Sequence, residues 1–264
     1  MNISKETQTL ERETEGIAYL AGDWPLDPEK STLVFIHGAG GSSAFWQEMI
    51  TGLSARVNTV AIDLPGRGRS NGPGKQKIED YASAVADFIT EINIPDPILC
   101  GLSMGGAIAQ QVLLDYPNRL KAAILIGTGA RMKVAPAIFE SIEKDYNNFV
   151  DWLCKICISK ITDSKIVNPF REDMLRCKPE ITHGDFRACD RFDVADRLAA
   201  IETPVLVVTA EEDKLTPPEF GDFLEKQIKN ASRAHIMDAG HIVPIEKSDE
   251  INKTIMKFLD QTGL

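Results

Sequence analysis

Short runs of consecutive hydrophobic residues, bounded by turn-forming residues, recur along the chain. Runs without polar alternation are typical of strands whose two faces are both buried, as in a parallel sheet that is covered by helices. We therefore expect buried strands in most of these runs. They span residues 32–36, 57–62, 97–100, 122–126, 204–209 and 234–237.

Between these runs, hydrophobic residues recur at helical spacing, as in residues 81–92 and 107–114. A last helix is predicted to start at Ser248, a suitable N-cap residue. Strands that alternate with helices indicate a mainly parallel sheet with helices on both faces. The opening segment, residues 9–19, turns near Glu15-Gly16 and predicts an antiparallel hairpin at the sheet edge.

The alternation stops between about Ala130 and Ala200, where the pattern becomes helical and irregular. We interpret residues 1–130 and 201–264 as an α/β core and residues 131–200 as a mostly helical cap. An insertion at this point is expected to cover the carboxyl ends of the strands, where open α/β sheets bind ligands. Its hydrophobic residues could line a pocket or form the core of the cap itself. The candidate pocket residues are Val134, Ile138, Phe139, Trp152 and Leu153.

The composition narrows the classes of partner. The net charge is −10, so nucleic acid and anionic membrane surfaces would be repelled on average. Residues 1–15 are polar and unlike a secretory signal, and no apolar run reaches the roughly 18 residues of a membrane span. We expect a soluble, cytoplasmic protein that acts on a small molecule, and the sequence leaves its oligomeric state open.

The five cysteines show no regular disulfide framework, so free thiols in a reducing compartment are expected. Cys154 and Cys157 form a C-x-x-C pair that could be half a zinc site or a redox pair. Their neighbours are apolar and no second pair stands at ligand spacing, so a structural role is favoured. No metal and no organic cofactor is predicted.

A reactive serine is predicted at residue 103. The sequence Gly101-Leu102-Ser103-Met104-Gly105 follows a predicted buried strand and precedes a predicted helix. A serine on a sharp turn at the top of a strand exposes its hydroxyl, and the flanking glycines leave room for that turn. The pentapeptide alone is a weak signal, but its position between strand and helix makes Ser103 a strong candidate nucleophile.

A serine nucleophile needs a base, and histidine is the side chain best suited to that role near neutral pH. Of the four histidines, His241 lies in a loop just past the last predicted strand, which is a strand carboxyl end. His37 more plausibly braces a loop, His183 lies in the predicted cap with a surface role or a substrate contact, and His235 falls inside an apolar run that favours packing. His241 is therefore the predicted base.

The base in turn needs a carboxylate that holds its tautomer. Glu211, Glu212 and Asp213 follow the predicted strand 204–209, whereas the strand end at residues 127–129 contains no acid. Asp213 is our choice, with Glu212 as the alternative.

Acyl chemistry also needs amide donors for the developing oxyanion. We predict the N–H groups of Ala39 and Met104 in this role. The glycine-rich loop around Ala39 lacks the lysine and the glycine spacing of nucleotide-binding loops.

Ser103, Asp213 and His241, in this order along the chain, resemble the α/β-hydrolase superfamily, and the resemblance runs over nearly the whole chain. The turn from Asp63 to Ser70 is similar to the turn that follows a core strand in this superfamily. The histidine loop is also similar; it continues through Pro244 and Glu246. In the superfamily, both segments mainly shape the walls of the site.

The resemblance implies an α/β-hydrolase fold and a serine esterase or lactonase that works through an acyl-enzyme. Serine at the elbow disfavours the epoxide-hydrolase and dehalogenase branches, whose members carry aspartate there. A carbon–carbon bond hydrolase, a perhydrolase, an acyl transferase or a non-catalytic small-molecule receptor remain as alternatives. The sequence does not identify the substrate.

Overall fold

The computed structural model describes residues 9–264, so part of the polar amino-terminal segment lies outside the described residues. Its centre is an eight-stranded sheet with the order β1-β2-β4-β3-β5-β6-β7-β8. The pairs β1/β2 and β2/β4 are antiparallel and all the others are parallel. The strands are β1 (Leu10–Thr14), β2 (Ile17–Ala21), β3 (Thr32–Ile36), β4 (Asn58–Ile62), β5 (Pro97–Leu102), β6 (Ala122–Ile126), β7 (Val205–Ala210) and β8 (Ala231–Ile236).

The central strands are buried because helices cover both faces of the sheet. In β3, Val34 and Ile36 pack into one hydrophobic cluster, whereas Leu33 and Phe35 pack into another on the opposite face. Successive side chains of a strand point to opposite faces, so a strand buried on both sides must be hydrophobic at every position. The expected mainly parallel sheet with helices on both faces is confirmed.

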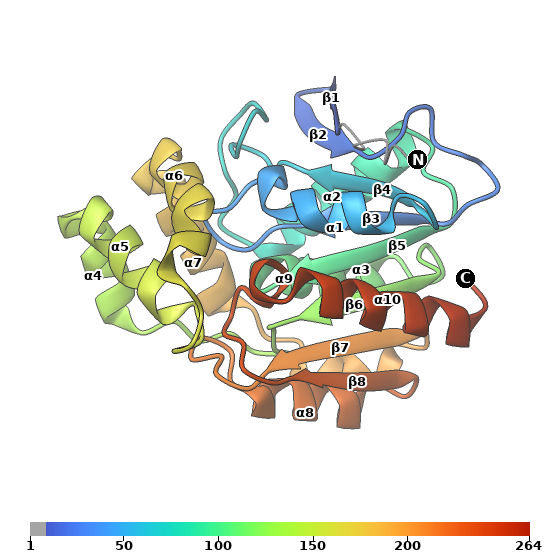
Figure 1. Cartoon of the computed structure of the whole chain (residues 1–264). Coiled ribbons are helices and arrows are strands. Elements are labelled where there is room, and N and C mark those ends of the chain that lie inside the picture. Colours follow the sequence, from blue (N-terminus) through green and yellow to red (C-terminus); the bar gives the residue numbers. More distant parts are fainter. Residues whose placement is uncertain (1–8) are drawn as a thin grey trace, which may run out of the picture.

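The helices form two layers and an additional group (Figure 1). Hydrophobic residues of α2, α3 and α8 belong to the cluster on one face of the sheet, and those of α1 and α10 to the cluster on the other. The helices are α1 (Gln47–Leu53), α2 (Ile78–Glu91), α3 (Met104–Asp115), α4 (Pro136–Lys144), α5 (Tyr146–Ile156), α6 (Asn168–Arg176), α7 (Pro179–Arg191), α8 (Pro218–Gln227), α9 (Val243–Glu246) and α10 (Ser248–Thr262). Short 3₁₀ turns occur at Ser43–Trp46 (η1), Ser164–Val167 (η2) and Ala195–Ala200 (η3).

The helices α4 to α7 lie between β6 and β7 in the chain and project from one end of the sheet (Figure 1). We call residues 131–200 the insertion. Its two ends adjoin: the Val194 N–H donates to the carbonyl of Ala130 at 2.9 Å, and Arg131 pairs with Asp193. The chain therefore leaves the sheet and returns to it at nearly the same place, and residues 131–200 remain our interpretation of the cap.

Of three predictions about individual elements, the first is confirmed and the other two are wrong. The hairpin is present, and Glu15 and Gly16 at its turn both have positive φ. Strand β8 is mostly exposed rather than buried, because it forms the sheet edge. Ser248 is the first residue of α10 and not its N-cap, which is Lys247.

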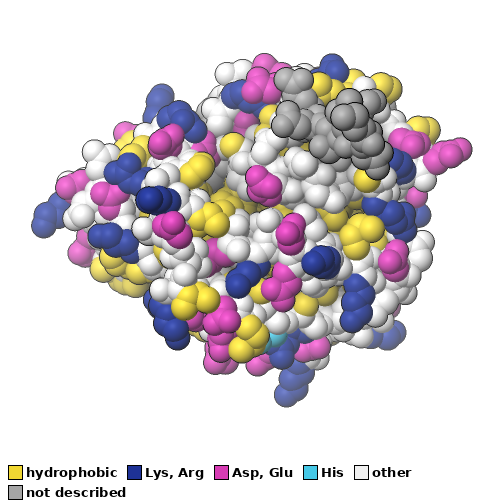
Figure 2. Space-filling model, in the orientation of Figure 1, with side chains coloured by type: hydrophobic (Ala, Val, Ile, Leu, Met, Phe, Trp, Pro, Cys, Tyr) yellow, Lys and Arg dark blue, Asp and Glu magenta, His cyan; other side chains and the backbone are white. Residues whose placement is uncertain are grey.

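Charged side chains of both signs are scattered over the surface that faces the viewer in Figure 2. Acidic and basic groups are interspersed there, and hydrophobic and uncharged polar atoms lie between them. Among the described residues, no helix is both long and apolar enough to cross a bilayer.

Candidate active site

Ser103 occupies a strained turn between β5 and α3. Its φ and ψ are +55° and −116°, a conformation that side-chain-bearing residues rarely adopt. Packing enforces this turn: a Cβ on Gly101 would lie 2.2 Å from the carbonyl carbon of Gly105, and a Cβ on Gly105 would lie 2.1 Å from the carbonyl oxygen of Ile36. Only glycine fits at either position, and the tight turn presents the Ser103 hydroxyl at the end of the strand.

Asp213 and His241 form a buried pair that comes from the loops after β7 and β8. The distance from His241 Nδ1 to Asp213 Oδ2 is 2.8 Å. The amides of Leu215 and Thr216 each donate to Asp213 Oδ1 at 2.9 Å, and the Thr216 hydroxyl donates to Oδ2 at 2.8 Å. Because an ionised carboxylate only accepts, Nδ1 of His241 carries the proton and Nε2 is the acceptor.

The electrostatic setting keeps Asp213 ionised. Burial by itself would raise the pKa of Asp213. The charge that His241 carries when it is protonated and the hydrogen bonds from His241 and Thr216 together outweigh burial, so the pKa of Asp213 lies below its ordinary value.

The acid-free end of β6 makes room for this pair. Gly127 has a φ of +49°, and a Cβ there would lie 3.2 Å from Asp213 Oδ2 and 3.4 Å from His241 Nδ1. The strand end that carries no acid is therefore the surface against which the acid from the next strand packs.

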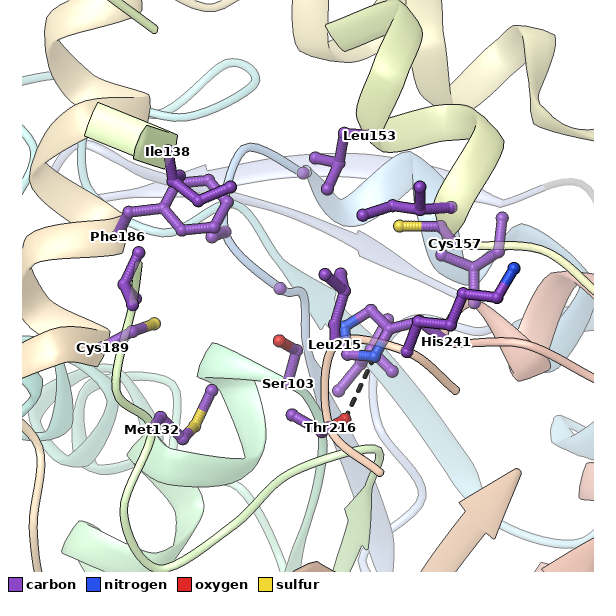
Figure 3. Close-up of a pocket in the computed structure, with 18 of the residues that line it drawn as sticks. Ser103, Met132, Ile138, Leu153, Cys157, Phe186, Cys189, Leu215, Thr216 and His241 are labelled. Carbon is purple, nitrogen blue, oxygen red and sulfur yellow. Dashed lines mark hydrogen bonds between the residues drawn. The ribbon is translucent and has the colours of Figure 1, made fainter. Parts of the chain in front are cut away.

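Ser103 and His241 line the same cavity, whose volume is about 550 Å³ (Figure 3). Among the hydrogen bonds of the described residues, none joins Ser103 Oγ to His241. A hydroxyl that rotates about its Cα–Cβ bond can make that contact when a substrate orders the site. The walls come mainly from the loops after the strands and from the insertion, and are largely apolar. They include Phe45, Leu102, Met132, Val134, Ile138, Trp152, Leu153, Ile156, Phe170, Phe186, Leu215 and Ile242.

The two predicted amide donors flank Ser103. Ala39 lies in the loop after β3 and lines the cavity, while Met104 is the first residue of α3. In the part of the chain that the structure describes, neither N–H has a protein acceptor. A Cβ on Gly38 would lie 3.3 Å from the Cβ of Ser103, so this loop packs directly against the serine.

Four of the five predicted pocket residues line the cavity, and Phe139 does not. The Phe139 ring instead packs against the His183 ring, with centroids 5.1 Å apart, and lies 5.9 Å from the guanidinium carbon of Arg187. Helical geometry explains this correction, because neighbouring residues of α4 point in different directions. The four that line the cavity are Val134, Ile138, Trp152 and Leu153.

Sequence reasoning did not find Phe45, Phe170 and Phe186, which complete the cavity wall. They come from η1, α6 and α7, and no local motif marks them.

The remaining histidines have other partners. The buried His37 ring contacts the carbonyl of Gly38 at 2.8 Å through Nδ1 and receives the N–H of Leu64 at Nε2, while burial lowers its pKa. His183 pairs with an exposed glutamate on α4. The exposed His235 contacts the hydroxyl of Thr209 at 2.9 Å.

Other carboxylates near the site bind backbone or surface groups. Glu212 accepts from Ser159 Oγ and Lys160 N, in the insertion. Glu246 accepts the N–H of Gly240, directly before His241, at 2.7 Å. Asp63 accepts the N–H of Ser43 at 2.6 Å and that of Arg69 at 3.0 Å.

One acidic group could in principle hold a cation: the carboxylates of Glu211, Glu212 and Asp238 lie within 4.8 Å of one another at the surface. Exposed acidic groups of this kind are common without an ion, so we do not assign a metal site here.

We compared the sequence and the fold of this chain with those of known proteins. A sequence profile described as the alpha/beta hydrolase family matches residues 33–254. The chain belongs to this family, and the expected α/β-hydrolase fold is confirmed.

Its relatives include a 3-oxoadipate enol-lactonase from Acinetobacter baylyi, 25% identical over 86% of this chain and 88% of the relative. A pimeloyl-[acyl-carrier protein] methyl ester esterase from Neisseria meningitidis is 26% identical over 87% and 92% of the two chains. The solved structure of a thermophilic esterase superposes with a TM-score of 0.83 at 28% identity, over 97% of this chain and 98% of that one.

Proposed function

We propose that this family member is a serine hydrolase that cleaves a small to medium carboxylic ester, or a lactone or thioester, through an acyl-enzyme on Ser103. One observation carries the proposal: the strained Ser103 lines the same cavity as His241, and Nδ1 of His241 is hydrogen-bonded to the buried Asp213. The relatives named above, two esterases and an enol-lactonase, support an ester bond as the target.

In the proposed reaction, His241 Nε2 takes the proton of Ser103 while Ser103 Oγ attacks the ester carbonyl. The N–H groups of Ala39 and Met104 receive the oxyanion, a contribution of roughly 100 to 1000-fold in rate for each donor. His241 then protonates the leaving alcohol and later activates the water that releases the acid. Asp213 stays ionised throughout and stabilises the imidazolium.

The cavity walls favour an apolar acyl or alkyl group. Apart from the candidate catalytic residues, the lining is mostly aliphatic and aromatic, and no carboxylate side chain of the described residues lines it. Closing such a pocket around a substrate excludes water and strengthens the electrostatic contacts at the carbonyl. The free thiols of all five cysteines support a reducing, cytoplasmic location for this activity.

The decisive experiment compares wild type with Ser103→Ala on 4-nitrophenyl esters of graded chain length and on lactones. We expect turnover to fall to background and covalent labelling of the intact protein by a fluorophosphonate to disappear. Ser141→Ala is the matched control, because Ser141 is exposed on α4 and bonds only to its own helix. Retained turnover and labelling in Ser103→Ala would overturn the proposal.

A further inference from the structure

Beside the candidate active site, a buried ion pair joins the insertion to the α/β core, which comprises the described residues outside 131–200. Asp185 on α7 pairs with Arg67, from the loop after β4, and both side chains are fully buried. Burial lowers the pKa of the Arg67 guanidinium, but the Asp185 carboxylate outweighs this and raises it. The hydroxyl of Tyr81 donates to Asp185 Oδ1 at 2.6 Å.

Asp185 also accepts a hydrogen bond from the loop after β3, which carries Ala39. The N–H of Gly40 donates to Asp185 Oδ2 at 3.0 Å, across 145 positions of sequence. Gly40 directly follows Ala39, whose N–H is the proposed oxyanion donor. The insertion also contacts Gly40 from α6, since a Cβ there would lie 2.6 Å from Cε of Met174.

An ion pair alone would not require this contact. Arg67 and Tyr81 already supply charge and hydrogen bonds to the carboxylate, and buried ion pairs often add little net stability. The hydrogen bond from Gly40 instead fixes one peptide plane of a loop that contains three glycines, Gly38, Gly40 and Gly41. A shift of about 1 Å in a group that positions the reacting atoms can cost about 100-fold in rate.

We propose that Asp185 is a positioning residue, which holds the Ala39 amide in place for the oxyanion by accepting the N–H of Gly40. This inference rests on the proposed function. It makes the geometry of the oxyanion site depend on a side chain of the insertion, so a substrate-dependent movement of α7 would change the rate of the chemical step.

A single Asp185 variant would leave Arg67 unpaired and could unfold, so the test uses two double variants. Asp185→Asn with Arg67→Gln removes both charges but keeps a side-chain oxygen that can accept from Gly40. Asp185→Leu with Arg67→Met also removes both charges but leaves no acceptor. Tyr81→Phe is the matched control, because it removes a different hydrogen bond from the same carboxylate.

We expect Asp185→Asn/Arg67→Gln, like Tyr81→Phe, to keep kcat close to that of wild type. Asp185→Leu/Arg67→Met should lose about 10 to 100-fold in kcat with little change in KM. Its affinity for a trifluoromethyl ketone, which forms a tetrahedral oxyanion on the serine, should fall in parallel. Circular dichroism and thermal unfolding establish that each variant is folded.

A backbone variant isolates the hydrogen bond from Gly40 to Asp185 even if the double variants unfold. Glycolic acid incorporated in place of Gly40 converts one amide to an ester and removes only the N–H, with the ion pair intact. A similar loss in kcat supports the proposal, and unchanged kcat overturns it. If Ser103→Ala is inactive while this backbone-ester variant and Asp185→Leu/Arg67→Met turn over esters normally, the positioning role fails and the proposed function stands.

Discussion

Asp213 accepts hydrogen bonds from the protein backbone as well as from His241, and its charge therefore has two uses. It orients the imidazole, and it satisfies the two amides of the loop that precedes α8. A neutral replacement of similar shape should disturb the first use more than the second.

We expect Asp213→Asn to reduce kcat by about 10³ to 10⁴-fold, because an amide at this position no longer fixes the productive tautomer of the base. Steady-state kinetics with the preferred ester checks this, with Glu212→Gln as control, since Glu212 contacts the insertion and not His241. A loss smaller than that of Glu212→Gln would remove Asp213 from the mechanism.

The same residue predicts a dependence of stability on pH. The pKa of Asp213 is lower in the folded protein than the value of about 3.9 expected when unfolded. Its ionised form therefore adds to the free energy of unfolding above about pH 4, and this contribution is lost as the pH falls through the folded pKa. The stability difference between wild type and Asp213→Asn, measured by urea unfolding from pH 7 to pH 3, should shrink toward the acid end. A constant difference would contradict this linkage.

At the scale of elements, the sequence predicted where strands occur better than where each strand lies in the sheet. Residues 32–36 and 122–126 match β3 and β6 in full, because a strand buried on both faces leaves a continuous hydrophobic run. Strand β8 lies at the sheet edge, and its exposure depends on having one neighbouring strand rather than two. Position in the sheet cannot be deduced from such a run, so the expected burial of His235 was wrong.

The turn that carries Ser103 provides an element-scale prediction. Gly105→Ala should reduce ester turnover by about 10-fold or more, because its Cβ would overlap the carbonyl oxygen of Ile36 and push α3 away from β3. Gly72→Ala is the control: an alanine there strains a backbone with positive φ, but its Cβ would have no other atom within 4 Å. Equal turnover in the two variants would show that close packing at Gly105 does not set the position of Ser103.

At the scale of the whole molecule, the candidate site combines what local sequence encodes with what only folding brings together. Ser103 was identifiable because its strand, turn and helix are consecutive. Asp213 and His241 were identifiable because each follows a recognisable strand. Most of the other wall residues were not, because their common cavity depends on how the insertion packs over the sheet; Phe45, Phe170 and Phe186 are examples. The same reason explains why Phe139 was wrongly assigned to the wall.

Two adjacent residues of α4 test the cavity itself. Ile138→Ala should enlarge the pocket and raise KM for medium-chain esters, since an apolar contact of about 1 to 3 kcal/mol is lost. Phe139→Ala should leave KM unchanged, because Phe139 packs outside the cavity. Kinetics over a series of acyl chain lengths separates the two, and an equal effect of both variants would mean that α4 acts only through the stability of the insertion.

The adjoining ends of the insertion also bear on how such enzymes can be rebuilt. Because Ala130 and Val194 are hydrogen-bonded to each other, the intervening chain can be exchanged for a shorter or longer segment without separating β6 from β7. A transplanted segment would inherit the serine, the histidine and the aspartate from its host. It would have to bring its own partner for the buried charge of Arg67 and its own acceptor for the amide of Gly40. A chimaera that supplies the first but not the second should fold yet turn over esters slowly.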